Sequence, residues 1–157
     1  MRRKNAKLPV LFIAIILIAY AINGYMADQS ISAREETYVT KVIDGDTIVI
    51  AGGQRVRLLS IDTRERGENC YSEAKQRLEE LVLLKNITLE RDREDKDQYD
   101  RLLRYIYTNE SFINLQMVKE GLAVAYIYEP SVKHRSQFIE AERAARSEGG
   151  CVWTKLP

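Results

Sequence analysis

Histidine and cysteine are scarce in this chain, and their scarcity argues against several kinds of site. The sequence of 157 residues contains one histidine, His134, and two cysteines, Cys70 and Cys151. Structural zinc sites need several cysteine and histidine ligands, and a histidine-dependent triad needs a histidine beside its nucleophile. We therefore expect neither a zinc centre nor such a triad, and no catalytic role for His134.

A large excess of either charge is also missing from most of the chain. Residues 31–157 carry 20 Lys and Arg against 22 Asp and Glu. Proteins that bind nucleic acid through bulk electrostatics present a basic surface instead. Any phosphate chemistry must therefore depend on charges placed locally.

The first 27 residues differ from the rest. Residues 1–7 include four Lys and Arg, and residues 8–27 carry no charge. This order is typical of a signal peptide or an uncleaved signal-anchor, and the run just reaches the roughly 20 residues that span a bilayer. The lack of a clean cleavage site slightly favours a retained anchor, while a buried core helix is the less favoured alternative. In the favoured cases residues 28–36 form a polar tether, and residues 37–157 form a domain outside the cytoplasm.

The two cysteines fit this compartment. An even number of cysteines in an exported domain favours a disulfide. We expect Cys70 and Cys151 to be bonded, which would join the end of the chain to its middle. The alternative is two separate buried thiols.

Hydrophobic periodicity predicts a mixed fold. Val, Ile, Thr and Tyr are frequent over residues 37–61, and a Gly-Gly pair at 52–53 indicates a hairpin with a further strand ahead of it. The later pattern predicts, in order, a helix over 72–84, a strand over 86–92, an exposed charged loop over 92–100, a strand over 101–108, and helices over 111–121 and 131–150. Five strands interrupted by a helix suggest an α+β fold, with a five-stranded Greek-key OB-fold barrel, three helices packed outside it and an N-terminal hydrophobic helix.

Several charged residues lie at the edges of the predicted hairpin. Asp46 and Asp62 each sit at a strand edge, and two carboxylates with a backbone carbonyl suit Ca²⁺ or Mg²⁺. Arg57 precedes Asp62 by five residues and Glu65 follows it by three. A cation, an arginine and a free carboxylate are what phosphodiester hydrolysis requires. The alternative is simple strand-edge ion pairing, such as Arg57 with Asp62.

Three motifs in a fixed order carry a resemblance to a known family. They are "VIDGDT" at 42–47, "RLLSIDTRE" at 57–65 and "DQYDRLLRYIY" at 97–107, and the similarity continues through "GLAVAYIYEP" and "CVW". With these gaps, the chain resembles the thermonuclease or staphylococcal nuclease-like family over about residues 38–153.

The resemblance implies a five-stranded OB-fold barrel with three helices and Ca²⁺-dependent hydrolysis of DNA and RNA, preferably single-stranded, that leaves 3′-phosphate ends. It implies that Asp46, Asp62 and the Thr63 carbonyl bind the metal, while Asp44 supports them without direct contact. Arg57 would contact the scissile phosphate, and Glu65 would act as general base or orient the attacking water.

The same resemblance assigns a second group of residues to the substrate. Arg101 would be the second phosphate contact, and Tyr99 and Tyr126 would line a nucleotide pocket, where aromatic rings stack on bases. We expect Tyr128 and Trp153 to lie in the core.

Three positions depart from the family pattern. Arg64 stands where a proline is frequent, which should loosen the turn that carries Glu65. Asp100 replaces a glycine before Arg101 and could tether or weaken that arginine. Gln98 replaces a lysine that helps to bind nucleotide, so tight nucleotide binding is in question.

The sequence therefore predicts a monomeric Ca²⁺-dependent nuclease, exported or tethered to the membrane through residues 8–27. The main alternative is a non-catalytic OB-fold module that binds nucleic acid or protein. Such modules typically lose the acids and arginines, which this chain keeps. A membrane-anchored structural domain is the third hypothesis, but it leaves the order of the three motifs to chance.

Overall fold

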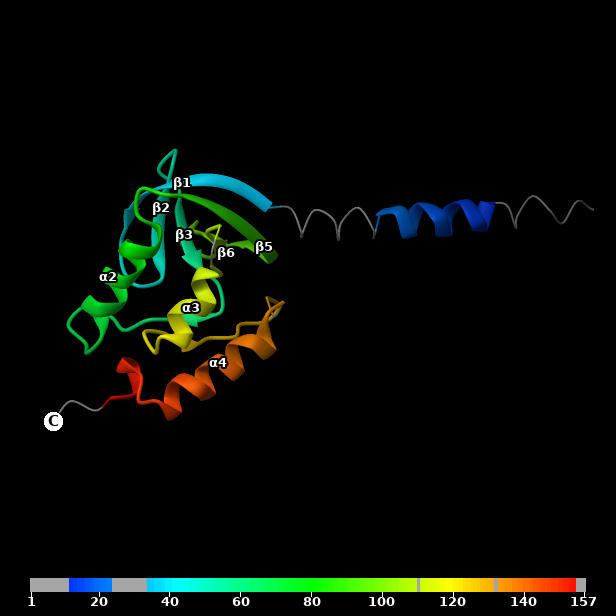
Figure 1. The fold of residues 1–157 in the computed structure, drawn as a ribbon. Helices are drawn as coiled ribbons and strands as arrows, with labels where there is room; N and C mark the ends of the chain where they lie inside the picture. Colours follow the sequence, from blue (N-terminus) through cyan, green and yellow to red (C-terminus); the bar gives the residue numbers. More distant parts are fainter. Residues whose placement is uncertain (1–11, 24–33, 110, 132, 155–157) are drawn as a thin grey trace, which may run out of the picture. The chain divides into compact units, whose positions relative to one another are not determined.

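The computed structural model describes residues 12–23, 34–109, 111–131 and 133–154 (Figure 1). The chain divides into two compact units, Met1–Ala33 and Arg34–Pro157. Residues 12–23 of the first unit form a helix. Within the described ranges, no helix has the length and apolar character needed to cross a membrane. The basic segment at 1–7 and most of the expected tether lie outside the described residues.

The second unit is built on a closed five-stranded barrel, as predicted. The strands follow the order β1-β2-β3-β6-β5 around the barrel, with β3 and β6 parallel and the other neighbours antiparallel. Alternate residues of these strands point inward, and the fully buried ones include Val39, Ile48, Val56 and Leu58. The strand bounds are β1 Arg34–Val42, β2 Thr47–Ile50, β3 Arg55–Leu58, β5 Asn86–Lys96 and β6 Leu102–Tyr107.

Helices pack outside the barrel, as the periodicity predicts. α2 (Tyr71–Val82) buries Ala74, Leu78 and Val82, which lie four residues apart on one helical face. α3 (Ile113–Lys119) contacts β6, α2 and α4 (Arg135–Ser147). The short 3₁₀ helix η1 (Cys151–Trp153) follows α4. A small separate sheet pairs β4 (Ile61–Asp62) with β7 (Val124–Ala125).

The structure corrects two boundaries. β1 begins at Arg34, so residues 34–36 pair with β5 instead of forming the end of a tether. β5 continues to Lys96, and the predicted exposed loop over residues 92–100 is therefore wrong for its first half. The many charges of this segment favoured a solvated loop, but Asp95 is paired with an arginine of the neighbouring strand. Arg104 of β6 donates hydrogen bonds to the Asp95 carboxylate at 2.7 Å and to its carbonyl at 3.0 Å.

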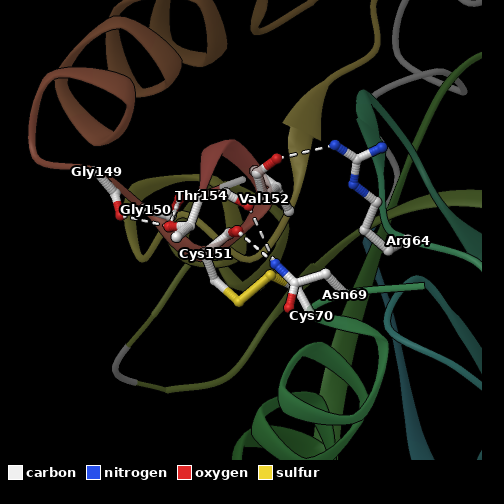
Figure 2. Close-up of a disulfide and its surroundings, with 8 residues drawn as sticks. All are labelled: Arg64, Asn69, Cys70, Gly149, Gly150, Cys151, Val152 and Thr154. Carbon is white, nitrogen blue, oxygen red and sulfur yellow. Dashed lines mark hydrogen bonds between the residues drawn. A yellow bond between two sulfur atoms is a disulfide. The ribbon is translucent and has the colours of Figure 1, made fainter. Parts of the chain in front are cut away.

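The Cys70–Cys151 disulfide is present, which confirms the predicted pairing (Figure 2). It joins the residue before α2 to the first residue of η1, 81 positions later, with the two Cα atoms 5.8 Å apart.

Candidate active site

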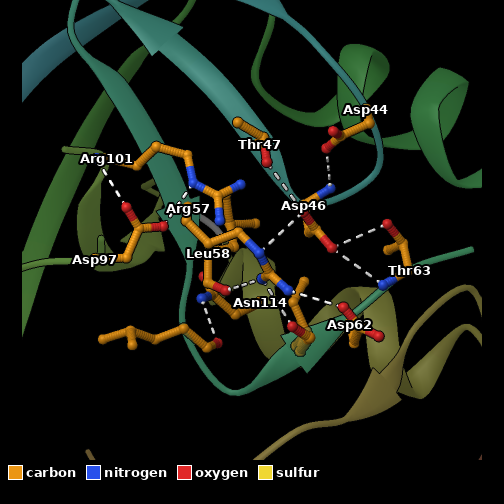
Figure 3. Close-up of polar contacts among 12 residues, drawn as sticks. Asp44, Asp46, Thr47, Arg57, Leu58, Asp62, Thr63, Asp97, Arg101 and Asn114 are labelled. Carbon is orange, nitrogen blue, oxygen red and sulfur yellow. Dashed lines mark hydrogen bonds and ion pairs between the residues drawn. The ribbon is translucent and has the colours of Figure 1, made fainter. Parts of the chain in front are cut away.

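Arg57 lies between the carboxylates of Asp46 and Asp62 (Figure 3). Its Nε is 3.2 Å from Asp46 Oδ1, and its Nη2 is 2.9 Å from Asp62 Oδ1. The Arg57 and Asp46 side chains are 15% and 10% exposed, whereas Asp62 is 52% exposed. The structure thus brings together three residues that the sequence placed in one site.

Backbone carbonyls fix the direction of the Arg57 guanidinium. Nη1 donates to Leu58 O at 2.6 Å and to Ile61 O at 2.7 Å. A guanidinium has five N–H groups. Hydrogen bonds to these two carbonyls and to the Asp62 carboxylate take three of them, and Nε faces Asp46 as an ion pair. One Nη2 hydrogen is left for a ligand. Asn114 also fixes the short loop between β3 and β4, because its Nδ2 donates to Leu59 O at 2.9 Å.

The β1–β2 turn presents Asp46 through close packing. Asp44 Oδ1 accepts from the Asp46 N–H at 3.1 Å, so Asp44 shapes the turn. Asp46 Oδ2 accepts from both the N–H and the hydroxyl of Thr63 at 3.1 Å. A Cβ at Gly45 would lie 2.8 Å from the Ala74 and Thr63 side chains, so only glycine fits there. Asp46, Thr63 and Asp44 therefore lie together, as predicted.

The acids crowd one another. Burial raises the pKa of Asp62, and the Asp46 and Glu65 charges raise it further, while Arg57 opposes both. Burial and the neighbouring Asp46 likewise raise the pKa of Asp44. This is the behaviour of carboxylates that share a site, and a bound cation would favour their charged forms.

The second arginine of the predicted site, Arg101, forms an ion pair with Asp97. Arg101 Nε is 2.6 Å from Asp97 Oδ2, and the Arg101 N–H donates to the same carboxylate. Burial alone would raise the pKa of Asp97, but hydrogen bonds from the backbone and side chain of Arg101 and from the Tyr99 backbone outweigh it and lower that pKa. Asp100 pairs with Lys96 at 2.7 Å. The expected tether on Arg101 is therefore supplied by Asp97, and not by Asp100.

Both arginines line one cavity of about 460 Å³. Tyr99 and Tyr126 line this cavity, with 61% and 55% of their surface exposed. Tyr128 lines it too and is 58% exposed, so its assignment to the core is wrong. Ser131 was not recognised from the sequence. It is buried at the cavity, and its hydroxyl has no hydrogen-bond partner among the described residues.

Glu65 lies on the exposed loop between β4 and α2, near enough to Asp62 for its charge to affect the pKa of that acid. Across residues 12–23, 34–109, 111–131 and 133–154, no three His, Cys, Asp or Glu side chains form a metal-binding cluster. The Asp46 and Asp62 carboxylates and the Thr63 carbonyl are the oxygens that could hold a cation. Asp46 would have to give up part of its present contacts, because its two oxygens face Thr47, Arg57 and Thr63. An all-oxygen set of this kind fits a hard cation such as Ca²⁺. His134 contacts Tyr107 and Glu90 and does not line the cavity.

A closed barrel that carries paired acids, arginines and an aromatic-lined cavity defines an OB-fold protein with a charged binding site. Residues 55–155 match the family model described as "Staphylococcal nuclease homologue". The chain is 32% identical to a thermonuclease of Staphylococcus intermedius, and the alignment covers 99% of this chain and 100% of that protein. The chain belongs to the staphylococcal nuclease-like family.

Two Bacillus subtilis relatives are longer. Endonuclease YncB is 42% identical over 73% of this chain, which spans 60% of that protein. The SPbeta prophage-derived endonuclease YokF is 40% identical over 73% of this chain, which spans 43% of that protein. The thermonuclease and endonuclease relatives support a nuclease, and therefore a hydrolase, as the activity of this chain.

Proposed function

We propose that this chain is a Ca²⁺-dependent nuclease that hydrolyses the phosphodiester bonds of DNA and RNA outside the cytoplasm. The observation that carries the proposal is the position of Arg57, which bridges Asp46 and Asp62 and also lines the cavity with Arg101. Family membership makes phosphodiester hydrolysis the chemistry to test.

The cation would be held by Asp46, Asp62 and the Thr63 carbonyl. When bound, a divalent cation supplies positive charge beside the phosphate. Asp46 is nearly buried and fixed by Thr63, so one donor is already oriented, whereas the half-exposed Asp62 is accessible from solvent. Ca²⁺ suits this set because it accepts irregular oxygen coordination completed by water.

The chain's own residues would carry out the hydrolysis. Glu65 accepts a proton from water as the water oxygen attacks phosphorus. Arg57 and Arg101 donate hydrogen bonds to the phosphate oxygens, whose charge grows in the transition state. The P–O5′ bond breaks, so the phosphate stays on the 3′ oxygen, and the 5′ oxygen takes a proton from solvent water and leaves as a hydroxyl. Arg101 can keep its Nε bond to Asp97 and donate to phosphate through its Nη groups, for which no partner is found among the described residues.

The cavity favours single-stranded substrate. Tyr99 and Tyr126 offer exposed rings, and a base must be unpaired to stack on them. Stacking tolerates every base, so little sequence preference is expected. Gln98 lines the same cavity without adding positive charge, so we expect weak binding of free nucleotides.

The test uses the full chain in mild detergent with single-stranded DNA and with RNA. We expect cleavage in Ca²⁺, little in Mg²⁺ and none with a chelator, with 3′-phosphate ends on the products. Glu65→Gln and Arg57→Lys should each lower kcat by roughly 10²-fold or more, because each removes a contact needed in the transition state. Arg55→Lys, on the same strand, is the matched control and should retain activity.

The alternative hypothesis, a non-catalytic OB-fold module, predicts a different result in this assay. Binding of both nucleic acids without cleavage under any metal condition would support it and reject the nuclease. Cleavage that survives Glu65→Gln would reject the role of Glu65 alone.

A further inference from the structure

The C-terminal segment, residues 149–154, is connected at three points to the loop between β4 and α2, residues 63–70, which carries Glu65 (Figure 2). The Cys70–Cys151 disulfide is the first. Asn69 Nδ2 is the second, since it donates to the carbonyls of Cys151 and Thr154 at 3.4 and 3.3 Å. Arg64 is the third, and its Nη2 donates to Val152 O at 2.8 Å.

The segment that receives these ties is itself fixed. The Val152 N–H donates to Gly121 O at 3.0 Å, and the Val152 side chain is buried. A Cβ on Gly121 would lie 2.4 Å from the Gly150 Cα, so the two backbones touch. The Gly150 N–H donates to Ala145 O at the end of α4. The segment is therefore a rigid support.

The Glu65 loop has little to hold it otherwise. Residues 64–68 are exposed, and Gly67 adopts φ +93°, which glycine reaches at no steric cost. Within the loop, the Glu65 N–H donates to Glu68 Oε2 at 2.8 Å, and the Glu68 N–H donates to Glu65 O at 2.9 Å. The ties to the C-terminal segment lie on both sides of Glu65, at Arg64 and at Asn69 with Cys70. Arg64 takes the place of the frequent proline, and its side chain makes a bond that proline cannot make.

We propose that Arg64 and the Cys70–Cys151 disulfide are positioning residues that hold Glu65 in its catalytic place, so that full turnover requires the oxidised chain. This rests on the proposed function, because Glu65 must act on the reacting water. A misplacement of about 1 Å can cost a reaction on the order of 10²-fold, so a loosened loop should lower kcat while leaving substrate binding in the cavity intact.

Reduction provides a direct probe. Dithiothreitol supplies two electrons and two protons. The S–S bond breaks to give the Cys70 and Cys151 thiols, and the reagent closes into its own cyclic disulfide. The reduced chain keeps every residue of the cavity and loses only one tie.

The experiment measures kcat and KM for the full chain at a temperature where circular dichroism shows every variant folded. We expect Arg64→Ala, the Cys70→Ser/Cys151→Ser double variant and reduced wild type each to lose kcat on the order of tenfold. KM should change by less than about twofold. Arg64→Lys should recover part of the rate. Arg66→Ala, on the same exposed loop, should behave as wild type, and dithiothreitol should not affect the double variant.

Unchanged kcat in Arg64→Ala and in reduced wild type would overturn the proposal, as would a loss confined to KM. Should the double variant fail to fold, Arg64→Ala and the reduced wild type still decide the matter. Glu65→Gln in the same series separates the proposed role of Glu65 in hydrolysis from the proposed positioning of Glu65 by Arg64 and the disulfide. If it is inactive while Arg64→Ala is unaffected, only the positioning role fails. If Glu65→Gln keeps full kcat, the role of Glu65 in the proposed function fails instead.

Discussion

Glu90 is an acid that the barrel buries among cations. Its side chain is 4% exposed and lies beside Lys133, Arg34 at 3.5 Å and His134 at 3.8 Å. Burial alone would raise the pKa of Glu90, but hydrogen bonds from Lys133 and Tyr107 and the charges of Lys133 and His134 outweigh it and lower that pKa. The folded state therefore binds the Glu90 proton less tightly than the unfolded state does.

This direction sets a pH dependence. A lowered carboxyl pKa stabilises the fold above the ordinary value of 4.5, and that stability is lost as the pH falls through the lower folded value. We predict that Glu90→Gln lowers the free energy of unfolding by about 2 kcal/mol at pH 7. The difference should shrink as the pH falls through the lowered pKa of Glu90 in the folded state. Urea unfolding of both proteins between pH 3 and 7 measures it.

Glu36→Gln, an exposed acid on β1, is the control and should differ little from wild type at any pH. A Glu90→Gln deficit that stays constant down to pH 3 would mean that shape, and not charge, explains the loss.

At individual residues, the sequence predicted which residues gather in the site better than it predicted the hydrogen-bond partner of each side chain. The spacing of Asp46, Arg57 and Asp62 predicted their meeting, because a hairpin aligns its strand edges. The spacing contained no sign that Asp97 holds Arg101. The exposure of Tyr128 was missed because a tyrosine in an apolar run looks like core whether its ring points inward or outward.

At the scale of elements, one buried polar side chain of α3 forms hydrogen bonds with the barrel, beside the apolar packing of Ile113, Met117 and Val118. Asn114 is fully buried; its Oδ1 accepts from the Ile106 N–H at 2.8 Å, and its Nδ2 donates to Leu59 O and Arg104 O at 2.9 and 3.2 Å. These bonds connect the start of α3 to β6 and to the loop after β3. The loop is the one whose carbonyls orient Arg57.

We predict that Asn114→Ala lowers the free energy of unfolding by roughly 2–4 kcal/mol, because the Ile106 N–H and Leu59 O lose their buried side-chain partner. Arg104 O keeps the hydrogen bond that the Leu59 N–H donates to it. Urea denaturation should show a lower midpoint with an unchanged slope. Asn109→Ala, at an exposed asparagine in the turn before α3, is the control and should change stability by less than about 0.5 kcal/mol. A loss in Asn114→Ala no larger than that would show that α3 is held by apolar packing alone.

Element types were predicted more successfully than their ends. The periodicity of α2 and α4 follows from the faces that they bury, and the Gly52-Gly53 turn fixes the β2–β3 hairpin. The end of β5 was misjudged because charge density reads as solvent exposure, whereas Arg104 on the neighbouring strand neutralises Asp95. β4 and β7 are two residues each, too short for an alternating pattern to register.

At the scale of the whole molecule, the disulfide and the N-terminal segment both concern the compartment in which the domain works. Disulfides persist in oxidising compartments, and Cys70–Cys151 closes a loop of about eighty residues, as 81 positions separate the cysteines. Residues 8–27 follow a basic start and carry no charge. Both features favour a domain that works outside the cytoplasm.

We therefore predict that the full chain, expressed in a bacterial host, is found in the membrane fraction with its nuclease domain open to protease added outside protoplasts. Replacing Ile15 and Ile16 with lysine should abolish this, since each charge costs about 3 kcal/mol at the centre of an inserted helix. Ile15→Leu with Ile16→Leu is the matched control. An intact chain with reduced cysteines in the cytoplasm would reject export, whereas a shortened, active chain in the medium would keep export and identify residues 1–27 as a cleaved signal peptide.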